Sequence, residues 1–326
     1  MEAASSPMSS TIARGLVLLV LAGTAMGAAS AGRGQDPAPG AQEPARPTFS
    51  SGTDLVVLHV TVFDRRGEPV PQLTRDVFHV VEDGIPQTIT MFSDGDSPVA
   101  VGLVVDNSSS MLTRRSMVLA GIKAFADASQ AEDQAFTIVF NEDVRRALPG
   151  SIAFTNSPAI LQASVNAMPA GGKTALHDAV IAGLDHLDTA EREKRVLVVL
   201  SDGEDNASRD SEDAMLRRAD RSDALIYTVS TARLDVNVGN ERLLRKLAQA
   251  TGGNAYTPKS ERDVIAAFAD IAGKIRQGYT LGYVPTNPAH DGSYRRLIVR
   301  VLAPGMRAPV VHARDGYLAP LHQHGR

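Results

Sequence analysis

The feature that most constrains the fold is the stretch Val99–Met111, which reads VAVGLVVDNSSSM. Its first half is a continuous apolar run, which is typical of a strand covered on both faces in a parallel sheet. The run ends in Asp106, and hydroxyls follow at Ser108 and Ser110. Ligands of open parallel sheets bind beyond the carboxyl ends of the strands. The spacing Asp-x-Ser-x-Ser lets one carboxylate and two hydroxyls converge there, and these hard oxygen donors suit Mg²⁺ better than zinc or copper.

The region around this stretch alternates between strands and helices. From Ser97 to Gly278, apolar strand segments such as Val196–Leu200 are followed by segments with apolar residues at helical spacing. Asn240 and Ser260 are placed to cap two of these helices. Such alternation predicts an α/β fold with a doubly wound, mostly parallel sheet flanked by helices.

The two flanks of this region show the two-residue period of half-buried strands. On the N-terminal side, Asp76–Val81 and Ile85–Phe92 are predicted to form a hairpin around Glu82-Asp83-Gly84. On the C-terminal side, the period runs through Tyr279–Leu318. Each flank is too small for a secure core of its own. We therefore predict that the N- and C-terminal β segments pack together as a β-sandwich, into which the α/β domain is inserted.

The N-terminus indicates export. Arg14 precedes the short apolar segment Leu16–Leu21, and Ala29-Ser30-Ala31 fits a signal-peptidase site. The apolar segment is too short for a confident membrane span, so we expect no stable span after signal cleavage. Cysteine is absent from the 326 residues, which excludes disulfides and zinc-thiolate sites. We expect a soluble product that is secreted or periplasmic.

The predicted organisation has six parts. These are a signal peptide (1–31), a linker rich in Pro, Ala, Gly and Gln (32–52), an N-terminal β segment (53–96), the α/β domain (97–278), a C-terminal β segment (279–320) and a tail (321–326).

Two further loops are predicted to lie near Asp106. One contains Thr174, in Gly171-Gly172-Lys173-Thr174, and the other contains Asp202, directly after the strand Val196–Leu200. Both occur where a strand end meets a helix start, so they fall on the same edge of the sheet. The formal charge of −4 gives no electrostatic reason to expect nucleic acid as a partner.

At this point the sequence resembles the von Willebrand factor A-type domain family over Ser97 to Gly278. The family's metal-ion-dependent adhesion site has the pattern Asp-x-Ser-x-Ser, then Thr, then Asp, which corresponds to Asp106, Ser108, Ser110, Thr174 and Asp202. The flanks, with Glu82-Asp83-Gly84 early and Asp315-Gly316 late, look like a secreted bacterial subfamily of von Willebrand factor A-related proteins.

This resemblance implies a binding module that holds Mg²⁺ (or Mn²⁺ or Ca²⁺). Ser108, Ser110 and sometimes Thr174 would bind the ion directly, while Asp106 and Asp202 would act largely through waters. One position would stay open for an Asp or Glu carboxylate of a protein partner. Asp178, Glu204 and Asp205 are candidates for orienting those waters and hydroxyls, and they fit solvated loop positions equally well.

Two other functions have to be weighed against a non-enzymatic binding module. A magnesium-dependent hydrolase or phosphatase-like enzyme also places an Asp after a first parallel strand, but aspartyl phosphotransferases need a second acid where this chain has Ser108. No nucleophile elbow or phosphate-binding loop is present in the sequence. In the third alternative, the metal only locks three loops together and the β-sandwich makes the contacts to a partner.

Overall fold

The computed structural model describes residues 55–95, 97–166, 169–232, 239–306 and 308–321. The predicted signal peptide (1–31) and linker (32–52) lie outside these residues, as do positions 322–326 of the predicted tail. None of the helices within the described ranges is long and apolar enough to cross a bilayer.

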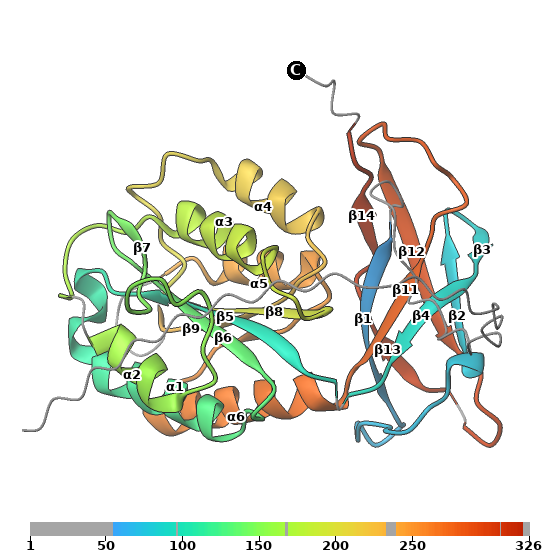
Figure 1. Cartoon of the computed structure of the whole chain (residues 1–326), viewed down its shortest axis with the longest axis horizontal. Coiled ribbons are helices and arrows are strands. Elements are labelled where there is room, and N and C mark those ends of the chain that lie inside the picture. The colour runs from blue at the N-terminus through green and yellow to red at the C-terminus, as the bar shows by residue number, and fades with distance from the viewer. Residues whose placement is uncertain (1–54, 96, 167–168, 233–238, 307, 322–326) are drawn as a thin grey trace, which may run out of the picture. The chain divides into compact units, whose positions relative to one another are not determined.

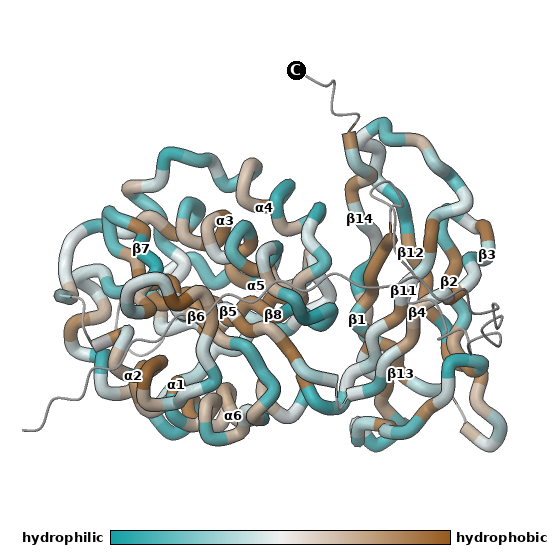
Figure 2. Tube along the Cα trace, viewed as in Figure 1, coloured by the Kyte–Doolittle hydropathy of each residue, from teal (hydrophilic) through white to brown (hydrophobic). Residues whose placement is uncertain are grey.

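Six of the described strands form a central sheet of the order β10-β9-β8-β5-β6-β7 (Figure 1). In chain order they are β5 (Val99–Asp106), β6 (Gln134–Phe140), β7 (Val144–Arg146), β8 (Lys194–Ser201), β9 (Leu225–Ser230) and β10 (Ala255–Tyr256). All neighbours are parallel except β7, which pairs antiparallel with β6. β5 is buried along its whole length between β6 and β8. This burial explains its unbroken apolar sequence, which Figure 2 shows as brown on the central strands.

Helices cover both faces of this sheet. Figure 1 shows one face under α3 (Leu176–Leu187), α4 (Glu212–Asp220) and α5 (Glu241–Ala250), and the other under α1 (Arg115–Asp127), α2 (Pro158–Asn166) and α6 (Glu261–Gln277). A 3₁₀-helix, η2 (Ser109–Arg114), joins β5 to α1. The sheet is therefore doubly wound and mostly parallel, and this part of the predicted fold class is confirmed.

The two predicted helix caps are present. The Asn240 side chain accepts a hydrogen bond from the Leu243 N–H at 3.0 Å, and Ser260 Oγ accepts one from the Asp263 N–H at 3.2 Å. The Asp263 carboxylate accepts a hydrogen bond from the N–H of Lys259, one residue before the cap. These bonds satisfy backbone donors that a helix start otherwise leaves without partners.

Two four-stranded antiparallel sheets are built from the flanks. One has the order β13-β1-β11-β4 and the other β14-β12-β2-β3. The strands are β1 (Val56–Phe63), β2 (Phe78–Glu82), β3 (Ile85–Gln87), β4 (Ile89–Ser93), β11 (Tyr279–Tyr283), β12 (Tyr294–Val301), β13 (Val310–His312) and β14 (Gly316–Leu318). A short 3₁₀-helix, η1 (Arg75–Val77), precedes β2.

These sheets face each other across one apolar core, as a β-sandwich does. Leu58 of β1 and Leu281 of β11 are register partners in one sheet, and they share a buried cluster with Phe78 and Leu297 of the other. Strands from both flanks occur in each sheet, because β1 pairs with β11 and β2 pairs with β12. The prediction that the α/β domain is inserted between β segments that form a sandwich is thus confirmed.

The predicted return strand Ile85–Phe92 is wrong as a single element. It is divided at Thr88 into β3, which pairs with β2, and β4, which pairs with β11 in the opposite sheet. The buried Gln87 amide fixes this change of sheet, since its Nε2 donates to Thr286 Oγ1 at 3.0 Å and its Oε1 accepts from the Thr286 N–H at 3.1 Å. The preceding turn has positive φ at Asp83 (47°) and Gly84 (86°), which matches a tight hairpin.

Candidate metal centre

Three loops meet at the carboxyl edge of the central sheet. β5 ends at Asp106 and its neighbour β8 ends at Ser201, so the residues that follow both strands lie at one edge. Thr174 lies in the loop before α3 and is 5% exposed. The parallel pairing of two buried strands is what places residues from distant parts of the sequence together.

Four of the five predicted residues form a continuous chain of contacts. Ser108 Oγ lies 3.1 Å from Ser110 Oγ, and Ser110 Oγ donates a hydrogen bond to Asp202 Oδ2 at 3.0 Å. Asp106 Oδ1 accepts a hydrogen bond from the backbone N–H of Ser108 at 2.9 Å. Asp106, Ser108 and Asp202 are all at most 3% exposed. The structure therefore gathers two carboxylates and two hydroxyls into one cluster, in which Ser110 is the partly exposed member.

Backbone hydrogen bonds tie the Thr174 loop to the other two loops. Gly172 O accepts from the Ser109 N–H at 3.1 Å, and Thr174 O accepts from the Asn206 N–H at 2.9 Å. In return, the Asn206 side chain accepts from the Thr174 N–H at 2.9 Å. These bonds fix the backbone on both sides of Thr174 relative to the cluster.

Asp106 lies in a buried environment that disfavours the ionised form of its carboxyl. Burial raises the pKa of this carboxyl to about 6, and the neighbouring charge of Asp202 also raises it. Hydrogen bonds from Ser108 and Ser201 oppose this effect. A cation beside Asp106 would favour the ionised form of its carboxyl.

The oxygen spacing fits a small hard cation. Adjacent oxygen ligands in an octahedron around Mg²⁺ lie about 3 Å apart, since each Mg–O distance is about 2.0–2.1 Å. The Ser108–Ser110 and Ser110–Asp202 oxygen separations of 3.1 and 3.0 Å have this size. Among the described residues, no group of three or more His, Cys, Asp or Glu side chains is placed to hold a metal. Any cation here would therefore depend on hydroxyl ligands as well as on carboxylates.

Sequence reasoning missed two residues of this cluster. Ser201 is fully buried, and its Oγ donates to Asp106 Oδ2 at 2.8 Å while accepting from the Gly203 N–H at 3.0 Å. Asn206 connects two loops through Thr174. The position of Ser201 beside Asp202, at the end of an apolar strand, was the signal that could have identified it.

The three carboxylates predicted to orient the site differ in their contacts. Asp178 accepts hydrogen bonds from the backbone N–H groups of Arg209 and Asp210, and Asp205 accepts from the N–H of His177 and the hydroxyl of Ser208. Both thus connect the loop after Asp202 to the start of α3. Glu204 is exposed, and its backbone N–H donates to Asp202 Oδ1 at 3.1 Å. Their predicted role around an ion stays a prediction.

Comparisons with known proteins agree with this architecture. The family model of the von Willebrand factor type A domain matches residues 100–270, which is more than half of the chain. A search of curated proteins gave no match.

Several solved structures are similar to this chain. A von Willebrand factor type A protein from Catenulispora acidiphila is 15% identical, with 86% of this chain and 76% of that one covered and a TM-score of 0.49. An aerotolerance-related membrane protein from Bacteroides fragilis is 18% identical, with 55% and 99% covered and a TM-score of 0.47. The von Willebrand factor domain of the type V pili tip protein Mfa5 from Porphyromonas gingivalis is 14% identical, with 55% and 95% covered and a TM-score of 0.45. On the match of its central domain, this chain belongs to the von Willebrand factor type A domain family.

Proposed function

We propose that this chain is an exported, non-enzymatic binding protein that uses a divalent cation, Mg²⁺ (or Mn²⁺ or Ca²⁺), to hold an Asp or Glu side chain of a protein partner. The binding domain is residues 97–278. The observation that supports the proposal is the chain of hydrogen-bonded residues from Asp106 through Ser108 and Ser110 to Asp202.

In this proposal, each residue of the cluster has a distinct part. Ser108, Ser110 and Thr174 would hold the cation directly, and Asp106 and Asp202 would act largely through waters. When bound, the cation supplies Lewis-acid attraction for an incoming carboxylate. Ser201 orients Asp106 through its hydrogen bond at 2.8 Å, and Asp202 orients Ser110 through its bond at 3.0 Å. Neutral hydroxyl ligands leave more of the cation's charge for the partner than carboxylate ligands would.

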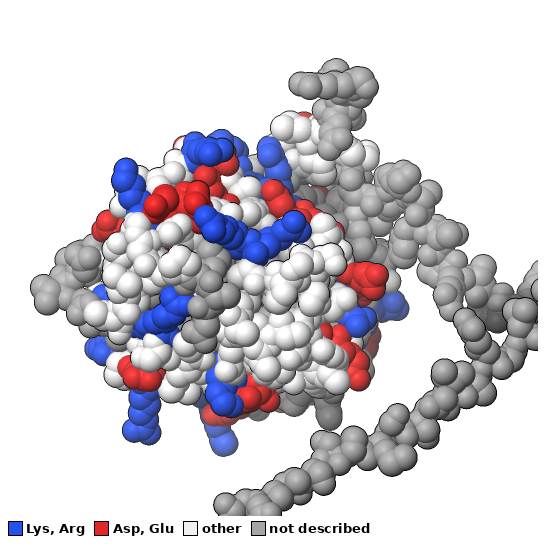
Figure 3. All heavy atoms as spheres, turned by 60° about the vertical axis from the view of Figure 1, so that its left-hand side comes forward, with Lys and Arg blue, Asp and Glu red and all other residues white. Residues whose placement is uncertain are grey.

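The distribution of surface charge supports recognition of a partner through a local site rather than through long-range electrostatic attraction. Figure 3 turns the left-hand side of Figure 1 forward and shows Lys and Arg mixed with Asp and Glu on this face. A mixed surface gives little long-range steering of a charged partner. The affinity for a partner would therefore depend on the metal centre and the residues around it.

The residue two places after Asp106 favours binding over phosphoryl transfer. Ser108 is buried there, and its Oγ contacts Ser110 Oγ at 3.1 Å. An aspartyl phosphotransferase needs a general acid at this position, and a serine hydroxyl does not release a proton at neutral pH.

Calorimetric titration tests this proposal directly. We expect Mg²⁺ and Mn²⁺ to bind the metal-stripped protein at one site, and Asp106→Ala and Asp202→Ala to reduce the affinity at least tenfold, because each removes a carboxylate of the cluster. Asp213→Ala is the matched control, since this exposed carboxylate lies in the first turn of α4. It should leave the affinity unchanged.

The outcomes separate the candidate functions. Metal-dependent capture of an acidic protein partner, lost in Asp106→Ala, would support the binding role. Metal that raises thermal stability but leaves partner binding unaffected would favour the structural lock. Hydrolysis of a generic phosphate ester that disappears in Asp106→Ala would contradict the non-enzymatic role.

A further inference from the structure

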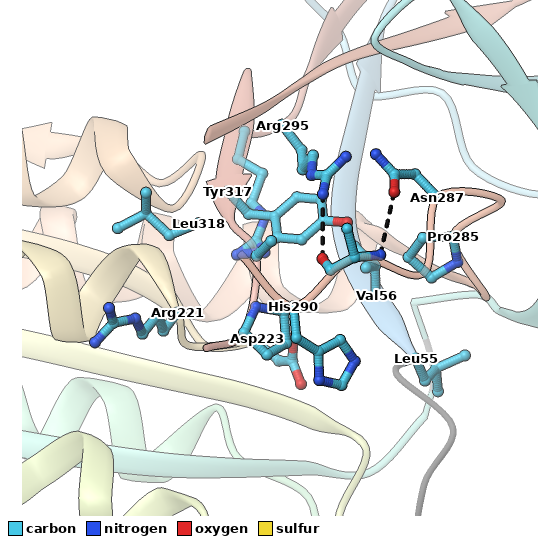
Figure 4. Close-up of a pocket in the computed structure, with 14 residues that line it drawn as sticks. Leu55, Val56, Arg221, Asp223, Pro285, Asn287, His290, Arg295, Tyr317 and Leu318 are labelled. Carbon is cyan, nitrogen blue, oxygen red and sulfur yellow. Dashed lines mark hydrogen bonds between the residues drawn. The ribbon is translucent and has the colours of Figure 1, made fainter. Parts of the chain in front are cut away.

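A second candidate site lies away from the metal centre. It is a partly open pocket of about 150 Å³, and Figure 4 shows the side chains that line it. Val56 is the first residue of β1 and Leu55 precedes it, while Arg221 and Asp223 come from the loop between α4 and β9. The rest come from the loop after β11 and from the region of β12 to β14. No residue of the metal centre lines this pocket.

Two buried arginines line the pocket. Arg295 donates to Ala289 O at 3.1 Å, and its side chain, which is 5% exposed, lies 3.3 Å from Asp291 Oδ1.

Arg314 is 6% exposed, donates to Ser222 O at 2.7 Å and lies over the ring of Tyr317. The Nε atom of Arg314 is buried and has no hydrogen-bond partner among the described residues. A buried donor without a partner costs free energy that a bound acceptor would recover.

The charges of the lining residues favour an anion. Three guanidinium groups, those of Arg221, Arg295 and Arg314, face one lining carboxylate, that of Asp223. Burial raises the pKa of Asp223, which favours its neutral form, and Arg314 opposes this shift. Burial also lowers the pKa of Arg314, because its guanidinium cation is poorly solvated. A bound anion would stabilise that cation in place of water.

The other residues that line the pocket indicate which kind of anion it fits. Leu55, Val56, Leu318 and Pro320 contribute apolar surface, which does not suit a fully hydrated inorganic ion. A cavity of this volume is known to accept a molecule as large as benzene, which has about six heavy atoms. Arg295 already has a carboxylate partner in Asp291, at 3.3 Å, which leaves less positive charge for a second negative charge on the ligand.

We propose that this pocket is a binding site for a small organic monocarboxylate of about six to nine heavy atoms. Its carboxylate would lie between Arg314 and Arg295, accepting from the free Nε of Arg314, and its hydrocarbon part would contact Leu55 and Leu318. Such a ligand would contact both the sandwich and the α4–β9 loop of the α/β domain.

Titration of butyrate into the full chain, followed by saturation-transfer NMR of the butyrate methyl group, tests the proposal. Butyrate and benzoate should bind saturably, whereas butyramide, which has the same shape without the charge, should bind at least tenfold more weakly. Arg314→Gln should weaken butyrate binding at least tenfold. Arg221→Ala removes an exposed lining cation and should weaken it about threefold to tenfold.

Arg217→Ala is the matched control, because this exposed arginine lies on α4 but does not line the pocket. If Arg314→Gln fails to fold, Arg221→Ala against Arg217→Ala decides the question. Equal binding of butyramide would overturn the assignment of a carboxylate, and tighter binding of inorganic phosphate would overturn that of an organic ligand. If neither acid binds saturably up to 10 mM, the proposal that the pocket binds free acids is overturned. If only a peptide binds, through its terminal carboxylate, the pocket is instead a site for a protein partner.

Discussion

Among the histidines of the described residues, His59 has the most strongly shifted pKa. Its contacts define which ring nitrogen carries the proton. Its Nε2 lies 2.9 Å from the carbonyl oxygen of Asp223, which can only accept, so Nε2 carries the hydrogen. Nδ1, at 3.2 Å from Thr280 Oγ1, therefore accepts from that hydroxyl. Burial, and then the charge of Lys194, lower the pKa of His59 to about 3. The folded protein thus holds this imidazole neutral.

The contribution of His59 to the free energy of unfolding should therefore fall as the pH falls below 6.5. Between pH 6.5 and about 3, the unfolded chain binds a proton at position 59 that the folded chain does not bind. The contribution is at most about 1.4 kcal/mol per pH unit. In urea unfolding, His59→Gln should reduce the loss of stability between pH 7.5 and 5.5 by about 1 kcal/mol. His79→Gln, at an exposed position on β2, is the control. Equal pH dependence in all three proteins would contradict the role of His59.

At the scale of single residues, the cluster around Asp106 was predicted from three loops at strand ends taken together, and its role in binding a metal stays a prediction. Asp106, Ser108 and Ser110 lie within one loop, so local geometry already limits their separation. Ser201 could not be assigned in the same way, because its contact with Asp106 depends on the register between β5 and β8. The arginine pocket was missed entirely, since Arg295, Arg314 and Arg221 come together only in the folded chain.

At the scale of elements, the contact between α1 and α6 depends on one glycine. Gly121 of α1 faces α6, and a Cβ atom there would lie 2.6 Å from the ring of Phe268 and 3.3 Å from Val264. Phe268 is 1% exposed, so its ring has no free space into which it can move. The small residue therefore sets the distance between the two helices.

Gly121→Ala should destabilise the protein by about 1–2 kcal/mol, because overpacking outweighs the better helix propensity of alanine. Gly273→Ala is a matched control within α6, since a Cβ atom at this position meets nothing within 4 Å. It should stabilise the protein by up to about 1 kcal/mol. Thermal and urea unfolding measure both changes, and the same sign for the two variants would refute the packing argument.

The sequence predicted most elements well where the signal was local. The helix starts at Asn240 and Ser260 follow from side chains that bond to their own first turn. The division of Ile85–Phe92 between two sheets could not be inferred, because its cause is the contact of Gln87 with Thr286, about two hundred residues further along. Strand pairing across such separations has no local signature.

At the scale of the whole molecule, the insertion itself was predictable, whereas the order of the strands was not. The short alternating flanks needed a shared core, which pointed to one sandwich. Nothing in the alternation distinguishes which strands become neighbours. In the structure, the chain leaves the sandwich after β4 and returns at β11, and Ser93 lies opposite Thr280 as a register partner.

From this last contact we predict an order of folding, with the α/β domain before the sandwich. Without a folded α/β domain, joining Ser93 to Thr280 would close a very long loop, and the folded domain lowers that entropic cost by about 3 kcal/mol. In pulse-labelling hydrogen exchange during refolding, the amides of β5 and β8 should gain protection before those of β1 and β11. Simultaneous protection of all four strands would contradict this order.

The same connection has a consequence for the chain as it is synthesised. Among the described strands, the neighbours of β1 are β11 and β13 and the neighbour of β4 is β11, so β1 and β4 are made long before their partners. These N-terminal strands stay without partners while the whole α/β domain is translated and folds. The nascent protein therefore carries exposed, aggregation-prone strand edges until its last segment arrives, which makes it a natural client for chaperones that shield unpaired strands.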